Sequence, residues 1–217
     1  MPIASRVSAA VVNFQTPDLI ETAVRTFHGH YPDVKLLVVD NGSQDDSREL
    51  IQRLARDLGP RITPLLLESN QYHGPAMDVA IRGINMEFIY LFDSDTETRK
   101  GGFLEGMVSA CEPADIYGAG KIVHVNQRGF AAREGGPVLS SAYMLIRRSL
   151  YLELPPFVHH GLPTLENFRA AASRGYRVAP FPIDKYVKHL GRGTAERFGY
   201  GLGFRSRLDY LLNKLGF

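Results

Sequence analysis

Short apolar runs alternate with amphipathic segments through the first 95 residues of the chain. The runs are rich in valine, leucine and isoleucine, and they cover residues 7–12, 34–39, 62–67 and 88–92. Runs of this length bounded by polar or turn residues predict buried strands, whereas apolar positions spaced three and four apart predict helices. Three successive strand–helix units predict right-handed crossovers and a parallel sheet.

The segments between these runs have helix signals. Pro17 suits the first turn of a helix, because that turn does not need its backbone N–H. Asp45 or Asp46 can cap a second helix that extends to Leu58. A third helix is predicted at about 75–83.

The rhythm changes after residue 95. The pattern predicts a helix at 101–108, short strands at 115–119 and 121–125, a loop at 126–137, a strand at 138–146, a helix at 163–174 and an extended segment at 176–181. Gly175 suits the end of the last helix. We therefore predict a single domain, 1–217, with a regular α/β first half, a mixed second half and a C-terminal tail.

Composition narrows the class of protein. The 217 residues are 44% hydrophobic and 22% charged, which is typical of a soluble globular enzyme, and the net charge of +2 gives no reason to expect a nucleic-acid partner. The single cysteine, Cys111, excludes an intrachain disulfide framework and fits a reducing cytoplasm, and we expect it to be a packing residue. No apolar stretch approaches the roughly 20 residues of a membrane span, and the N-terminus lacks a signal-peptide pattern.

Two carboxylates end the fourth apolar run. Asp93 and Asp95 directly follow residues 88–92 and are separated by one serine. Function in open parallel sheets gathers at the carboxyl ends of the strands. A carboxylate pair there suits a hard divalent cation that holds a phosphorylated ligand. Asp-x-Asp is common in loops, so the position of this pair after the fourth strand is what gives the pattern weight.

Four segments match, in order and spacing, those of a known enzyme family. They are residues 11–14 (VVNF), 37–45 (LVVDNGSQD), 70–76 (NQYHGPA) and 91–95 (LFDSD), with weaker matches at 142–148 and 175–178. The set resembles the family-two glycosyltransferases. The resemblance implies a GT-A fold, which is a Rossmann-like three-layer α/β/α sandwich with a mostly parallel central sheet and a smaller mixed β/α region. It assigns about 1–98 to a nucleotide-sugar-binding half, about 99–190 to an acceptor-side half and about 191–217 to a basic, aromatic tail.

The same resemblance implies metal-dependent transfer of a sugar from a nucleoside diphosphate donor, with a UDP-sugar favoured, to a hydroxyl of a glycan or lipid-linked saccharide. It implies a hexosyltransferase with an inverting outcome. Asp93, Asp95 and His189 are the implied ligands of Mn²⁺ or Mg²⁺, since a late histidine after a strand matches the family's order. An imidazole beside oxygen ligands suits Mn²⁺ better than Mg²⁺.

The resemblance also implies a set of residues that contact the donor. They are Thr16, Asp40, Asn41, Ser43, Asn70, Gly74, Asp78, Asp93 and Ser94. Asp40 can accept a hydrogen bond from a base or a ribose hydroxyl, and Gly74 permits close approach of the backbone to the nucleotide. Each also has a structural interpretation: a turn for Asp40, a helix cap for Thr16, and a helix start for Gly74 or Asp78.

The general base is the least defined part of the pattern. The family commonly places an acidic pair about a dozen residues before a Gly-Tyr, and here Pro163 stands at that distance from Gly175. Glu166 is the first candidate base and His160 the second. Glu166 also fits a charge at the positive end of a helix dipole. The departure leaves both the base and the stereochemical outcome open.

The tail from Thr194 to Phe217 mixes aromatic and cationic residues and is partly amphipathic. Three roles fit this composition: packing on the core, docking on a partner subunit such as a second copy in a homodimer, or lying on an anionic membrane that holds a lipid-linked acceptor. We expect a cytoplasmic protein, with the third role placing it peripherally at the inner face of the membrane.

Three other functions fit parts of the pattern. A haloacid-dehalogenase-like phosphatase also uses a strand-terminal Asp-x-Asp, but Glu97 stands where its threonine is expected. A sugar-nucleotide-forming nucleotidyltransferase is expected to have a Gly-rich loop after the first strand, whereas residues 13–16 read Asn-Phe-Gln-Thr. A nucleotide-sugar-binding module without turnover fits the missing acidic pair.

Overall fold

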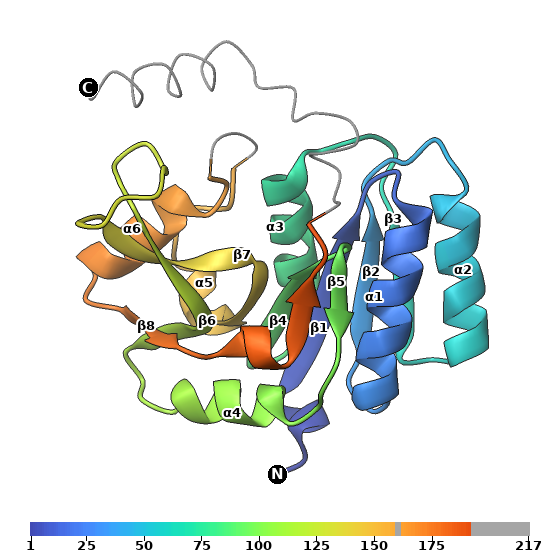
Figure 1. Ribbon diagram of the computed structural model, residues 1–217, viewed down its shortest axis with the longest axis horizontal. Coiled ribbons are helices and arrows are strands. Elements are labelled where there is room, and N and C mark those ends of the chain that lie inside the picture. The colour runs from blue at the N-terminus through green and yellow to red at the C-terminus, as the bar shows by residue number, and fades with distance from the viewer. Residues whose placement is uncertain (159–161, 192–217) are drawn as a thin grey trace.

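The computed structural model in Figure 1 describes residues 1–158 and 162–191. Two of the predictions above, His160 as a base and the amphipathic tail, lie outside the described residues. Among the residues that are described, no helix is both long enough and apolar enough to cross a bilayer.

A seven-stranded sheet runs through the middle of the molecule in the order β3-β2-β1-β4-β7-β6-β8. Its strands are β1 (Val7–Asn13), β2 (Leu36–Asp40), β3 (Ile62–Leu66), β4 (Phe88–Asp93), β6 (Ile116–Val125), β7 (Gly136–Arg147) and β8 (Arg177–Pro180). Only β7 runs antiparallel to its neighbours, β4 and β6. The sheet is therefore mostly parallel, as the apolar runs predicted.

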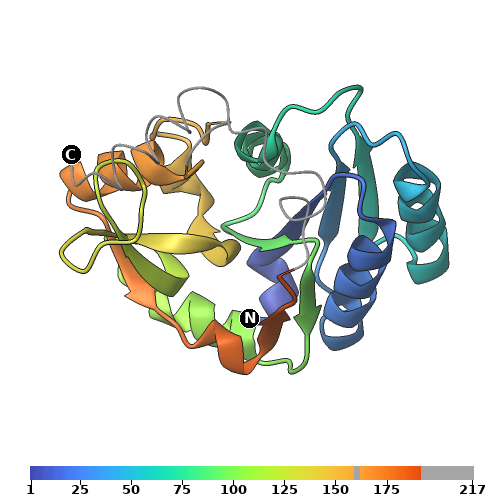
Figure 2. The same cartoon turned by 45° about the horizontal axis from the view of Figure 1, so that its top comes forward.

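Helices cover both faces of this sheet, which gives three layers (Figure 2). One face packs against α1 (Pro17–His30), α2 (Ser47–Leu58) and α4 (Phe103–Ala110), and the other against α3 (His73–Gly83), α5 (Arg148–Tyr151) and α6 (Leu165–Ser173). Successive residues of β1 alternate between the two cores, so Val11 joins the first and Val12 the second. This double burial explains why β1 is an unbroken apolar run.

A second, two-stranded sheet lies beside the first and was not predicted. Strand β5 (Thr96–Thr98) directly follows the Asp-x-Asp segment and pairs antiparallel with β9 (Val187–His189), with Thr96 opposite His189. Short 3₁₀ turns at Ile3–Ser5 and Ile183–Lys185 precede β1 and β9. The small sheet connects the middle of the chain to the last described residues.

Other local predictions compare well with the structure, with one correction. The segments 115–119 and 121–125 form the single strand β6, with an irregular register between Gly120 and Ile122, instead of two strands. Gly175 follows α6 at φ +81°, as a helix-ending glycine does. The Ser47 N–H donates to Asp45 Oδ1 at the start of α2. Cys111 is fully buried, and burial raises the pKa of its thiol to about 12.

Candidate functional site

The carboxyl ends of the central strands bring the predicted site residues to one edge of the sheet. The parallel register places Asn13 beside Asp40, and Val12 beside Asp93. The loops that follow β1, β2 and β4 therefore meet at this edge, as expected for ligand sites in open α/β sheets.

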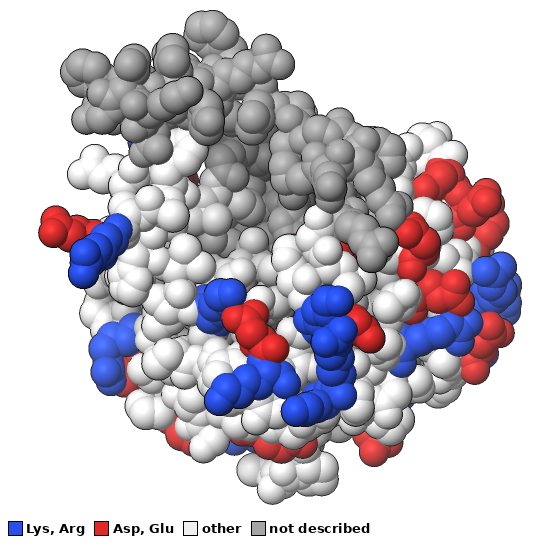
Figure 3. All heavy atoms as spheres, in the orientation of Figure 1, with Lys and Arg blue, Asp and Glu red and all other residues white. Residues whose placement is uncertain are grey.

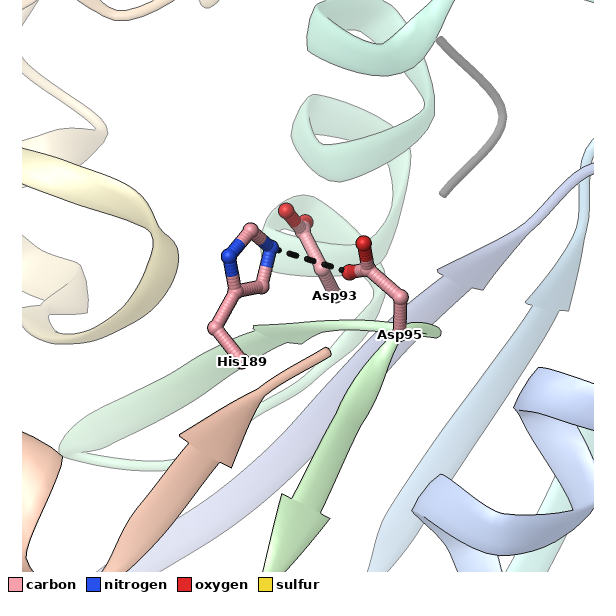
Figure 4. Close-up of side chains that lie close together, drawn as sticks. All are labelled: Asp93, Asp95 and His189. Atoms are coloured by element: carbon pink, nitrogen blue, oxygen red, sulfur yellow. Dashed lines mark ion pairs between the residues drawn. The ribbon is translucent and has the colours of Figure 1, made fainter. Parts of the chain in front are cut away.

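Asp93, Asp95 and His189 lie together at this edge, and each offers one ligand atom within 4.8 Å of the others (Figure 4). His189 Nε2 lies 3.1 Å from Asp95 Oδ1. The small sheet brings them together, because it sets Thr96 opposite His189 and the Leu190 N–H donates to the Asp95 carbonyl at 2.7 Å. The structure thus assembles the three residues from two segments that are far apart in sequence.

Contacts on several sides hold the imidazole ring of His189 in place. Its hydrogen bond with Asp95 raises the pKa of His189; partial burial and Lys121 oppose this, and the charges of Asp95 and Asp93 add to it. The ring of Tyr143 stands edge-on to the imidazole, with ring centroids 6.2 Å apart. The Tyr143 hydroxyl donates to Asp184, which pairs with Lys121 Nζ at 2.8 Å.

A second histidine, His73, also lies beside the carboxylates. His73 begins α3, and its Nε2 lies 3.3 Å from Asp93 Oδ1. Burial lowers the pKa of His73, but the charge of Asp93, its hydrogen bond with His73 and the charge of Asp95 together raise it more, so the net direction is upward. Sequence reasoning missed His73, because nothing in the local pattern shows that the first residue of α3 lies beside the end of β4.

The donor atoms in this group fit a divalent transition metal. Asp93 Oδ1 is buried and has the 3.3 Å ion pair with His73 but no hydrogen bond of good geometry among the described residues, so it can still accept a metal ion. Two carboxylates with one imidazole form the mixed oxygen and nitrogen set that Mn²⁺ accepts. The predicted metal ligands are thus brought together.

A buried polar network lies directly beneath the carboxylates. Asp40 is completely buried; Asn13 Nδ2 donates to its Oδ1 at 3.3 Å, and the Ser43 N–H donates to its Oδ2 at 3.0 Å. Thr16 Oγ1 donates to Asn13 Oδ1 at 2.8 Å and lies 3.2 Å from Ser94 Oγ. Four predicted donor-binding residues therefore come together, but they bond with the protein itself.

Two further predicted residues, Asn41 and Asn70, link the loop after β2 to the loop after β3. Asn41 Nδ2 donates to Asn70 Oδ1 at 3.1 Å, and Asn41 Oδ1 accepts from the Gln71 N–H at 2.9 Å. Gly42 between these loops has φ +77°, and a Cβ there would lie 2.4 Å from the carbonyl carbon of Ser69. Glycine is thus required at this position by both conformation and space.

Gly74 and Asp78, both on α3, have protein neighbours where the prediction placed a nucleotide. A Cβ on Gly74 would lie 1.8 Å from the carbonyl oxygen of Val158, so backbone fills the space beside this glycine. The Asp78 carboxylate accepts from the Tyr151 hydroxyl at 2.6 Å and from Arg82 Nε at 2.9 and 3.0 Å. These contacts show a structural role for each residue, and donor contact stays a prediction.

The candidate base lies on a different part of the molecule. Glu166 is exposed in the first turn of α6, which Figures 1 and 2 show beside β6 and β7. Its neighbour Asn167 is fully buried, accepts from the Tyr117 hydroxyl at 2.6 Å and donates to the Pro155 carbonyl at 2.7 Å. Among the described residues, no hydrogen bond or ion pair that we find links Glu166 to the metal-site group.

Two hollows open elsewhere on the described surface. One of about 400 Å³ lies between the β6–β7 loop and α6, and its lining includes Glu134, Leu165 and Arg169. It falls within the acceptor side expected from the sequence. Another of about 370 Å³ lies between α1 and α2, where carboxylates gather with basic residues interspersed (Figure 3). Neither hollow is lined by the metal-site group.

Comparison with known families identifies the class of this protein as a glycosyltransferase. The sequence profile described as Glycosyl transferase family 2 matches residues 8–169. The chain therefore belongs to glycosyl transferase family 2. An uncharacterized glycosyltransferase of Nostoc sp. is 24% identical over 114 residues, which are 52% of this chain and 35% of that protein.

Solved structures show the same GT-A fold. A mannosyltransferase from Pyrobaculum calidifontis, in complex with GDP-Man and Mn²⁺, has a TM-score of 0.65 and 18% identity, and the match covers 82% of this chain and 55% of that one. TarS 1–349 of S. aureus in complex with UDP-GlcNAc has a TM-score of 0.62 and 17% identity, covering 85% and 60%. Glucosyl-3-phosphoglycerate synthase from Mycobacterium tuberculosis has a TM-score of 0.61 and 17% identity, covering 81% and 69%. The chain thus spans about a third of the Nostoc protein and a little over half of the mannosyltransferase.

Proposed function

We propose that this protein transfers a sugar from a nucleoside diphosphate donor to a hydroxyl acceptor in a metal-dependent reaction. The observation that carries the proposal is the group of Asp93, Asp95 and His189, whose ligand atoms lie within 4.8 Å at the carboxyl edge of a GT-A sheet. The family membership supports the reaction class, because the match includes both aspartates.

Donor and metal are proposed from the neighbours. The mannosyltransferase was solved with GDP-Man and Mn²⁺, TarS with UDP-GlcNAc, and the mycobacterial synthase with Mn²⁺, UDP and glucosyl-3-phosphoglycerate. We propose a UDP-sugar as donor and Mn²⁺ as the preferred ion, with Mg²⁺ as its substitute. The imidazole of His189 favours Mn²⁺ in this choice.

We propose the following roles for the residues of the site in this reaction. Asp93, Asp95 and His189 would hold the ion against the diphosphate; a bound divalent cation acts there as a Lewis acid that neutralises charge on the leaving oxygen. Thr16, Asp40, Ser43 and Ser94 would set the loops around the donor from within the protein. Asn41, Asn70, Gly74 and Asp78 would shape the side of the pocket toward the nucleoside.

The acceptor side is proposed to be formed by residues 126–145 and 157–167. Glu166, with His160 as the second candidate, would accept the proton of the attacking hydroxyl and give a hexosyltransferase with an inverting outcome. The acceptor is proposed to be a saccharide or a lipid-linked saccharide. Peripheral membrane contact through the tail at about 191–217 and a homodimer belong to the same proposal.

A nucleotide-sugar-binding module without turnover is the second candidate. The observation that favours it is the position of Glu166, which is exposed on α6 and has no hydrogen bond or ion pair with the metal-site group that we find among the described residues. Donor binding without hydrolysis or transfer would support this alternative over the enzyme.

The test is calorimetric titration of UDP, GDP, dTDP and CDP with and without Mn²⁺, using the wild type and Asp95→Ala. We expect one nucleotide to bind only with Mn²⁺ and this binding to disappear in the variant. Asp115→Ala is the matched control, because Asp115 pairs with Arg177 on the exposed surface at 2.6 Å. Unchanged nucleotide binding in Asp95→Ala would refute the metal site, and no binding to the wild type would refute the donor site.

A further inference from the structure

His73 lies outside the three-residue group but is directed at it. Its Nε2 is 3.3 Å from Asp93 Oδ1, and each of the two side chains is 25% exposed. Among the described residues, His73 is the ionic partner of Asp93, just as His189 is the partner of Asp95. The two carboxylates, one residue apart, are thus each flanked by their own imidazole.

The backbone before His73 is held in an unusual conformation. Tyr72 has φ +65°, which a non-glycine residue adopts only at a cost. Its N–H donates to Asn70 Oδ1 at 2.8 Å, and Asn70 also accepts from Asn41 at 3.1 Å. Strain of this kind persists where surrounding contacts over-determine the conformation, and it clusters at functional sites.

The backbone after His73 is held as well. Gly74 contacts the backbone of Val158 so closely that a Cβ would lie 1.8 Å from the Val158 carbonyl oxygen. The imidazole therefore stands between two fixed neighbours at the start of α3.

His73 contacts Asp93 Oδ1, an atom of one of the proposed metal ligands. Asp93 Oδ1 is buried and accepts no well-directed hydrogen bond from the described residues. Two carboxylates this close repel each other, and without a partner the Asp93 carboxylate would turn away from Asp95. His73 supplies that partner from α3, and it is not one of the three residues whose ligand atoms lie within 4.8 Å of one another.

We propose that His73 is a positioning residue that holds the Asp93 carboxylate toward Asp95 and His189, so that the metal site is formed before the donor arrives. This inference rests on the proposed function of the same site. Groups that orient metal ligands typically affect metal affinity by roughly 10–100-fold when they are removed.

The test is titration of Mn²⁺ alone into the full chain, with thermal unfolding measured for every variant. His73→Leu removes the ring nitrogens, and His73→Gln places an amide N–H near the position of Nε2. His30→Leu is the control, because His30 is exposed at the far end of α1. We expect His73→Leu to weaken Mn²⁺ binding about tenfold or more, His73→Gln to stay within about threefold of the wild type, and His30→Leu to match it.

Each other outcome would overturn the proposal. Unchanged Mn²⁺ affinity in His73→Leu would show that the contact is incidental, and tighter binding would show that His73 only competes with the ion for Asp93. Equal loss in the Leu and Gln variants, with unchanged melting temperature, would point to direct ligation. If the wild type itself binds no Mn²⁺, the proposed function fails. If the wild type binds Mn²⁺ and Asp95→Ala abolishes this binding while His73→Leu leaves it unchanged, the proposal for His73 fails alone.

Discussion

The site edge contains two neighbouring groups of polar residues that look alike in sequence and differ in structure. Asn13, Thr16 and Asp40 are completely buried, and their polar atoms bond with one another or with nearby loops. Asp95 and His189 bond across the small sheet, while His189 is 40% exposed. The first group is bonded within itself, whereas the second brings two carboxylates and a partly exposed imidazole within 4.8 Å of one another.

This difference indicates that the first group stabilises the fold and that the second binds a ligand. Buried polar networks that are fully bonded fix the loops in one arrangement. Carboxylates close to each other are costly for the protein alone and become favourable when a cation binds between them. We therefore expect substitutions in the first group to reduce stability, and substitutions in the second to reduce binding.

The strongest test of the comparison is Asp40→Ala against Asp95→Ala. Removing Asp40 leaves the Ser43 N–H without its acceptor and leaves Asn13 Nδ2 with only the 3.5 Å bond to Ser43 Oγ. We expect the free energy of unfolding to fall by about 2–4 kcal/mol, whereas Asp95→Ala should change it by less than about 1 kcal/mol. Urea denaturation checks both. Equal losses would show that the two groups do not differ in this way.

A second test is Gly74→Ala, at the boundary between the two groups. The added methyl would meet the Val158 carbonyl at 1.8 Å, so the backbone must shift. We expect a loss of about 1–3 kcal/mol in the free energy of unfolding. Gly83→Ala at the other end of α3 is the control, because a Cβ there meets nothing within 4 Å. The control should be neutral or slightly stabilising, as measured by the same denaturation.

Thr16→Val sharpens the comparison within the buried group. Valine keeps the shape of threonine but removes the hydroxyl that donates to Asn13 and contacts Ser94. We expect a loss of about 1–2 kcal/mol in the free energy of unfolding, since a buried amide oxygen loses its donor. Thr16→Ser retains the hydroxyl and should lose less. A larger loss in the serine variant would contradict the importance of this hydrogen bond.

The smallest change in the free energy of unfolding is expected for Glu87, which pairs with Arg6 on the surface at 2.7 Å. This exposed ion pair is the reference against which the two groups are compared. The hydrogen bond from Arg6 lowers the pKa of Glu87 below its ordinary value of 4.5. Its contribution is therefore complete above pH 4.5 and is lost as pH falls through the lower folded-state pKa. Because Glu87 is 41% exposed, we expect Glu87→Gln to cost less than about 1 kcal/mol at pH 7.

The measurement is the difference in free energy of unfolding between wild type and Glu87→Gln at pH 7 and at pH 3. This difference should shrink at the lower pH, while that of the exposed Glu68→Gln should be near zero at both. A difference that grows on acidification would contradict the lowered pKa of Glu87.

The first half of the fold could be predicted because its strands are buried on both faces. Such strands are unbroken apolar runs, and β1 through β4 lie within about two residues of their predicted ends. Strands β5 and β9 have three residues each, too few to show a period, and their pairing joins Thr96 to His189. Pairing between segments so far apart leaves no local signal in the sequence.

The sequence predicted several residues of the candidate site but not their burial or their contacts. The carboxylates at the end of β4 were found because a charge directly after an apolar run is visible in sequence. The burial of Asp40 was not visible, since an aspartate that ends a strand reads the same whether it faces solvent or Asn13. His73 was missed because its contact with Asp93 depends on where α3 begins in space.

The short pairing of β5 with β9 also has a consequence for the order of folding. Thr96 and His189 are 93 positions apart, so their contact closes one of the long loops of the chain. Such contacts are slow to form because loop closure must precede any gain. A chain that has emerged from the ribosome only through β8 contains both carboxylates but not His189. If the site binds Mn²⁺ as proposed, acquisition of the ion during refolding would therefore report the pairing of β9 with β5.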